Sequence, residues 1–142
     1  MEIHEKIGFG VAIIIIALLA KQDIYERKIS LFTIIISGCI ALLYLAAGEK
    51  LDIVSLCLRI LPGVVLLFVS LLSDEKVGYG DGASVLMLGL WTSAAFCMLA
   101  TTIGMLLAGI YGLVLLITSK KEQQIPFLPF LLTAMEVLLV YV

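Results

Sequence analysis

Long apolar runs separated by short polar segments make up most of the chain. Four runs cover residues 7–20 (extendable back over 2–6), 31–47, 53–72 and 126–142. A further stretch, residues 84–117, holds no charged residue. A helix that crosses a bilayer needs about 20 mostly apolar residues, so this stretch is too long for one span and fits two short ones. With a turn at residues 90–96, where Trp91 marks the membrane interface, the pattern predicts an all-α polytopic membrane protein of about six transmembrane helices.

The composition agrees with this pattern. Of the 142 residues, 63% are hydrophobic and 14% are charged, and the mean hydropathy is +1.22. Soluble domains average about 45–50% apolar and about 25% charged residues. We therefore expect residues 1–142 to form a single transmembrane domain in a lipid bilayer. The net charge of −2 is too small to indicate a nucleic-acid partner.

The cysteines and the histidine do not form a metal-binding pattern. Three cysteines lie inside apolar runs, no CxxC pair occurs, and the chain has one histidine. A zinc site or a disulfide framework is therefore not expected, and we predict no metal and no cofactor.

Basic residues in the short loops predict the orientation. Loops after the first, third and fifth expected helices hold six basic residues, and the opposite side holds two. The richer side faces the cytoplasm, so both termini are expected on the other side. The six are Lys21, Arg27, Lys28, Lys76, Lys120 and Lys121, and the two are Lys6 and Lys50.

Two aspartates are expected at this cytoplasmic face. Asp81 lies in "VGYGDGAS", residues 77–84, before a fourth helix that is expected to begin near Ala83 or Ser84. Asp23 lies at the C-terminal end of the first helix. Two carboxylates that share a site cannot both ionise easily, so one can act as a base on water and the other as an acid. The alternatives are that Asp81 merely caps the fourth helix and that Asp23 is a solvated acid beside Lys21 or Arg27.

Residues around the aspartates have expected roles in shaping the site. Gly78 and Gly80 are predicted to adopt backbone conformations that are barred to other residues and so to bend the loop. Tyr25 and Tyr79 flank the aspartates and are candidates for substrate contact. A helix N-terminus favours a nearby anion, so Asp81 is expected to ionise more easily than Asp23.

Two charged residues fall within apolar runs, where charges are costly. We expect Arg59 to snorkel towards the outer membrane interface. Glu136 is expected to make a buried structural hydrogen bond, with substrate contact as the alternative.

Paired membrane aspartates also occur in proton- or cation-coupled transporters, where they lie near the bilayer midplane. Here both acids fall at helix ends on one face, which favours a protease. A catalytically inactive membrane scaffold stays open as a third class.

Three segments carry a resemblance to a known family. "GYGD", residues 78–81, resembles the GxGD motif of polytopic aspartyl proteases. "DIYERKIS", residues 23–30, resembles the first aspartate motif of the type IV prepilin peptidase family, in which an isoleucine follows six residues after the aspartate, here Ile29. "IPFLPFLLTA", residues 125–134, is similar to the segment before that family's last helix.

The resemblance implies an aspartic endopeptidase with Asp23 and Asp81 as its catalytic pair. Its partner would be a prepilin or prepilin-like substrate, cleaved at the cytoplasmic face of the cell membrane, and the oligomeric state stays open. The chain lacks the paired CxxC region with methyltransferase activity, so it resembles the short, peptidase-only members. Ala83 replaces a basic residue that is common in the family, and Ser30 and Leu31 replace Pro-Asn. These departures bear on substrate preference.

Overall fold

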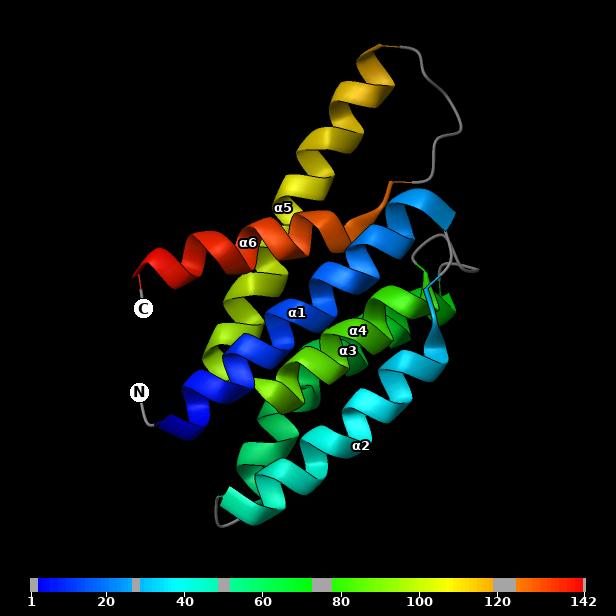
Figure 1. Cartoon of the computed structure of the whole chain (residues 1–142). Helices are drawn as coiled ribbons and strands as arrows, with labels where there is room; N and C mark the ends of the chain where they lie inside the picture. Colours follow the sequence, from blue (N-terminus) through cyan, green and yellow to red (C-terminus); the bar gives the residue numbers. More distant parts are fainter. Residues whose placement is uncertain (1–2, 27–28, 49–51, 73–77, 119–124, 142) are drawn as a thin grey trace.

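The fold is a bundle of helices. The computed structural model describes residues 3–26, 29–48, 52–72, 78–118 and 125–141, and within these ranges it contains helices and no strand. The helices are α1 (Ile3–Glu26), α2 (Leu31–Gly48), α3 (Ile53–Leu72), α4 (Tyr79–Trp91), α5 (Ala94–Ile117) and α6 (Phe127–Tyr141) (Figure 1). The predicted all-α class is confirmed, and α4 and α5 are divided at Thr92 and Ser93, inside the predicted turn.

The helices differ in length. By length and apolar composition, α1 (from Lys6), α2, α3 and α5 are able to cross a membrane. The other two are shorter: α4 has 13 residues and α6 has 15. At about 1.5 Å per residue they rise about 20 and 23 Å, less than the roughly 30 Å of a hydrocarbon core.

The short helix α4 lies at the centre of the bundle. It packs against α1, α2 and α3, and α5 contacts it as well. Glycines let α3 and α4 approach closely, as is common between membrane helices. A Cβ atom at Gly82 would lie 2.9 Å from the backbone nitrogen of Leu67, and one at Gly63 would overlap the backbone of Leu86. Most of the atoms in contact with α4 therefore belong to the other helices of the bundle.

The outer surface of the bundle is apolar. Large hydrophobic side chains on α2, α3 and α5 are exposed, among them Phe32, Leu43, Phe68, Leu113 and Ile117. The C-terminal half of α5 projects past the other helices in Figure 1, and its last buried residue is Gly104. Exposed apolar side chains in such number mark contact with lipid or with another protein. The chain is a membrane protein.

The C-terminal end of α4 lies inside the bundle and corrects two predictions. Trp91 is 8% exposed, and its indole Nε1–H donates to Ser37 Oγ at 2.9 Å, so it does not mark the membrane interface. The Arg59 Nη1–H donates to the Thr92 carbonyl oxygen at 3.0 Å, instead of snorkelling away from the protein. A helix that ends away from water has carbonyl groups without partners, and Arg59 satisfies one of them.

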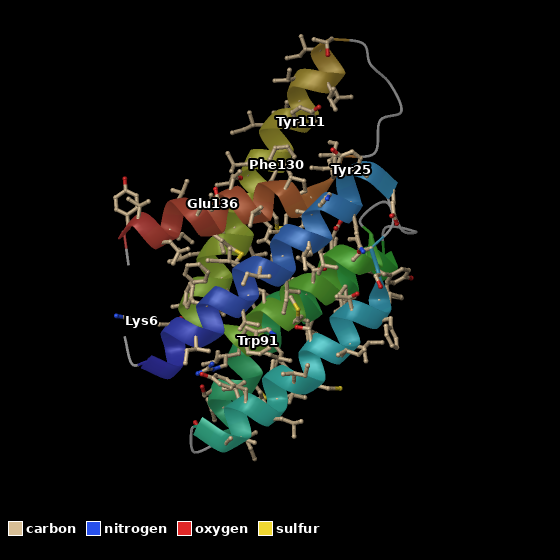
Figure 2. The ribbon with its side chains drawn as sticks, viewed as in Figure 1. Lys6, Tyr25, Trp91, Tyr111, Phe130 and Glu136 are labelled. Carbon is tan, nitrogen blue, oxygen red and sulfur yellow. The ribbon has the colours of Figure 1, made fainter. Side chains whose placement is uncertain are left out.

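Glu136 corrects a third prediction. Its side chain is exposed on α6, so the expected buried hydrogen bond is wrong (Figure 2). Most of the basic residues used to predict the orientation lie outside the described residues, namely Arg27, Lys28, Lys50, Lys76, Lys120 and Lys121.

The ends of several helices meet at one end of the bundle. Successive helices from α1 to α4 alternate in direction, so the end of α1 lies beside the starts of α2 and α4 (Figure 1). The start of α6 comes to the same place. This end of the bundle, called the polar end below, carries both predicted aspartates.

Candidate active site

Asp23 ends the buried face of α1. Ala12, Ile16 and Leu19 are completely buried and recur at helical spacing, and Asp23 follows Leu19 by one turn. The aspartate therefore points into the bundle. Its Oδ2 atom accepts a hydrogen bond from the backbone N–H of Leu128 at 3.3 Å.

This contact makes Asp23 a cap for α6. Leu128 is the second residue of α6, and the first N–H groups of a helix have no partner within it. Pro126, directly before α6, is a residue typical of helix starts. The hydrogen bond to α6 distinguishes Asp23 from the solvated surface acid that was the alternative. Sequence reasoning noted the segment 125–134 but missed the role of Leu128.

Asp81 lies in the first turn of α4, and not in a loop before it. The helix begins at Tyr79, four or five residues earlier than predicted, and Gly78 is its N-cap. Asp81 is therefore the third helical residue and not the cap residue. From this position its carboxylate accepts a hydrogen bond from the Gly78 backbone N–H, which is one half of a capping box.

The surroundings of Asp81 favour its protonated form. Asp81 belongs to α4, outside the four helices that are long enough to cross a membrane. Burial, followed by the nearby charge of Asp23, raises the pKa of Asp81 to about 7, and the Gly78 hydrogen bond opposes this rise. Two carboxylates from α1 and α4 thus act on each other. A raised pKa means that Asp81 loses its proton less easily, which is opposite to the expectation that Asp81 ionises easily.

The structure requires glycine at position 80 for a different reason from the one predicted. Gly78 has φ −65° and ψ 136°, an ordinary extended conformation, and Gly80 is part of α4. Neither glycine has the positive φ that would bar other residues. A Cβ atom at Gly80 would instead lie 2.7 Å from Ile29 Cδ1. The requirement is therefore space for Ile29.

The two tyrosines lie at the polar end with their side chains exposed. Tyr25 is 79% exposed at the end of α1 (Figure 2). Tyr79 is 38% exposed at the start of α4. The structure thus brings both residues to the same end as the aspartates, accessible to a bound molecule.

Within the described ranges, no three His, Cys, Asp or Glu side chains gather as a metal site. The chemistry available from these residues is that of two coupled carboxylates at the end of a helix bundle.

Comparison with known families decides the class of protein. A family model described as the type IV leader peptidase family matches residues 10–113, which include both aspartates. The chain belongs to the type IV leader peptidase family. This membership indicates a peptidase and confirms the resemblance inferred from the motifs. No curated protein and no solved structure matched the chain.

In this leader peptidase family member, the matched region ends inside α5. The segment that begins α6, including Leu128, therefore lies beyond it. The hydrogen bond between Leu128 and Asp23 joins that segment to the matched part of the chain.

Proposed function

We propose that the chain is an aspartic endopeptidase that removes the leader peptide of type IV prepilins or prepilin-like proteins at the cytoplasmic face of the cell membrane. The observation that carries the proposal is the electrostatic coupling of Asp81 to Asp23, across two helices of a leader peptidase family member. Their position at helix ends also favours a peptidase over a transporter, whose coupling acids lie near the bilayer midplane.

The two aspartates have different roles in this mechanism. Asp81, with its raised pKa, holds a proton and hydrogen-bonds to the scissile carbonyl oxygen, to which the proton passes as the tetrahedral intermediate forms. Asp23 takes the other role and is the base, since Asp81 holds the proton; its Oδ2 atom accepts the hydrogen bond from the Leu128 N–H, which keeps the carboxylate in place. It takes a proton from water as the water oxygen attacks the carbonyl carbon.

The second step completes the cleavage. The tetrahedral intermediate breaks its bond to nitrogen, and the leaving amine takes the proton that Asp23 gained. Asp81 regains its proton as the carbonyl double bond reforms. Both carboxyl groups return to their starting states, with one water consumed for each peptide bond.

The substrate class follows from where the pair lies. The aspartates are at one end of helices whose outer surfaces are apolar, so we place cleavage at the membrane surface. A prepilin with an apolar helix in the bilayer and a leader in the cytoplasm has the peptide bond between the two at the membrane surface. Tyr25 and Tyr79 offer exposed aromatic contacts beside it.

The experiment is co-expression with candidate prepilins from the same genome. The wild-type chain should shorten the substrate, measured by gel mobility and by mass spectrometry of the new N-terminus. Asp23→Asn and Asp81→Asn should each abolish cleavage. Asp52→Asn is the matched control, because Asp52 is exposed and precedes α3 at the opposite end of the bundle, and it should retain activity. Full activity of either site variant would refute the acid pair. A wild-type chain that cleaves none of the candidates would support the inactive scaffold.

A further inference from the structure

Two prolines lie at the start of α6. Pro126 directly precedes the helix, and Pro129 is its third residue. Proline has no backbone N–H, so neither residue can donate a backbone hydrogen bond. Between them lies Leu128, whose N–H donates to Asp23 Oδ2 at 3.3 Å. The prolines therefore stand on either side of the donor that α6 gives to Asp23.

Two other helices of the chain are capped at their third position. Ser30 Oγ accepts a hydrogen bond from the N–H of Thr33, the third residue of α2, at 3.4 Å. Ser93 Oγ accepts one from the N–H of Phe96, the third residue of α5, at 3.3 Å. A capping oxygen ordinarily takes the N–H of the second or the third helical residue. In α6 the third position has no N–H to offer, which leaves the second.

The missing N–H leaves one oxygen of Asp23 without a donor from this position. Oδ2 accepts the Leu128 N–H, and among the described residues no second donor contacts the carboxylate. Asp23 is only partly buried, so its Oδ1 atom can receive water. Each N–H that a carboxylate accepts favours its charged form. A base that accepted from both helical positions would therefore take a proton less readily.

We infer that Pro129 is a positioning residue for the proposed reaction: its missing N–H keeps Asp23 fixed through Oδ2 and leaves Oδ1 to take the proton from water. The inference rests on the proposed function, in which Asp23 is the base. The alternative is a structural role, because proline is tolerated in the first turn of a helix and makes the chain rigid there. The two roles differ in whether the absent N–H or the ring of the proline matters.

Pro129→Ala tests this with purified enzyme and a prepilin peptide that spans the cleavage site. The variant restores an N–H at the third position of α6. It should lower kcat roughly three- to tenfold, the effect of one hydrogen bond, and leave KM unchanged, because proton transfer and not substrate binding is affected. Pro126→Ala is the matched control: the same change falls before the helix, outside the two capping positions, and should retain wild-type kcat. Thermal unfolding of both variants verifies that they fold.

An ester at position 129 separates the N–H from the ring. Lactic acid, incorporated at a stop codon in cell-free translation, has the methyl group of alanine and an ester oxygen in place of the N–H. This variant should keep wild-type kcat, in contrast to Pro129→Ala. Equal losses of kcat in the alanine and ester variants would overturn the inference and assign Pro129 to the rigidity of the helix start. A loss in Pro126→Ala as large as in Pro129→Ala would overturn it as well.

The outcomes separate the two proposals. If the wild-type enzyme cleaves and Asp81→Asn does not, the proposed function stands, and wild-type kcat in Pro129→Ala refutes only the role of Pro129. If the wild-type enzyme cleaves no prepilin, both proposals fail.

Discussion

Ile29 lies directly against Gly80. A Cβ atom at residue 80 would fall 2.7 Å from Ile29 Cδ1 and 2.9 Å from Ile29 Cβ, closer than Cβ atoms normally come to other atoms. Ile29 follows Asp23 by six residues, and Gly80 directly precedes Asp81. The contact therefore joins the two aspartate segments and sets how near α4 comes to the chain that leaves α1.

Gly80→Ala should lower kcat/KM by roughly tenfold to a hundredfold, because the added methyl group pushes Asp81 away from Asp23 and a misplacement of about 1 Å can have such an effect. The double variant Gly80→Ala/Ile29→Val, which removes the Cδ1 atom, should recover part of the loss. Gly109→Ala is the matched control, since nothing lies within 4 Å of its added Cβ. Unchanged turnover in Gly80→Ala would show that the contact does not position Asp81.

Asp23 should have a structural role that is separable from catalysis. Asp23→Asn and Asp23→Leu should both be inactive, but only asparagine keeps an oxygen for the Leu128 N–H. Asp23→Leu should therefore unfold more easily than Asp23→Asn, by about 1 kcal/mol, the usual value of a helix N-cap. Thermal unfolding in detergent measures the difference. Equal stability of the two variants would mean that the cap contributes nothing.

The pH dependence should reveal Asp81. Its pKa is raised from 3.8 to about 7 in the folded chain, so between about pH 4 and pH 7 folding takes up a proton. Stability should fall as the pH rises through this window, because the folded state binds more protons than the unfolded state. Asp81→Asn should lose this part of the dependence, as measured by thermal unfolding at several pH values. An identical profile in the variant would contradict the assignment.

The same pKa predicts the pH profile of activity. Asp81 must be protonated to act as the acid, so kcat/KM should decline as the pH rises above about 7. Assays of the wild-type enzyme on one peptide at a series of pH values measure this decline. Activity that increases steadily from pH 6 to pH 9 would refute Asp81 as the acid.

Arg59 should matter for stability and not for chemistry. Arg59→Met leaves the Thr92 carbonyl oxygen without this donor, which should cost roughly 1–3 kcal/mol. The folded fraction should keep its kcat/KM, since Arg59, on α3, contacts the residue that follows α4, at the end of α4 opposite Asp81. Leu58→Met, at the adjacent exposed position of α3, is the control for the helix. A catalytic loss without loss of stability would contradict this view.

The orientation is testable by cysteine labelling. Tyr25→Cys and Gly48→Cys place a thiol at exposed positions at opposite ends of the bundle, in a chain without Cys39, Cys57 and Cys97. In intact cells, a membrane-impermeant reagent should label residue 48 and leave residue 25 unlabelled until the cells are opened. The reverse pattern would overturn the cytoplasmic placement of the polar end.

The sequence by itself determined the helical class and where the helices of the described residues lie, and its motifs pointed to two aspartates as the candidate pair. Apolar runs in a chain with 63% hydrophobic residues leave little choice but membrane helices, since lipid offers no partners to the backbone. The uncharged stretch 84–117 was divided correctly because it exceeds one bilayer crossing. Asp23 and Asp81 were identified by their motifs, and both lie inside the family match.

Only the tertiary structure decided what each polar group contacts. The hydrogen bonds of Asp23 to Leu128 and of Arg59 to Thr92 join residues far apart in the chain, and no local pattern predicts them. The sequence predicts a conformational role for Gly80, because it does not show that Ile29 occupies the space of the absent side chain. A helix N-terminus lowers the pKa of a nearby carboxyl group, but burial and the charge of Asp23 raise the pKa of Asp81 and outweigh this effect. Periodicity specifies which residues are helical, whereas the packing of the helices determines which atoms meet.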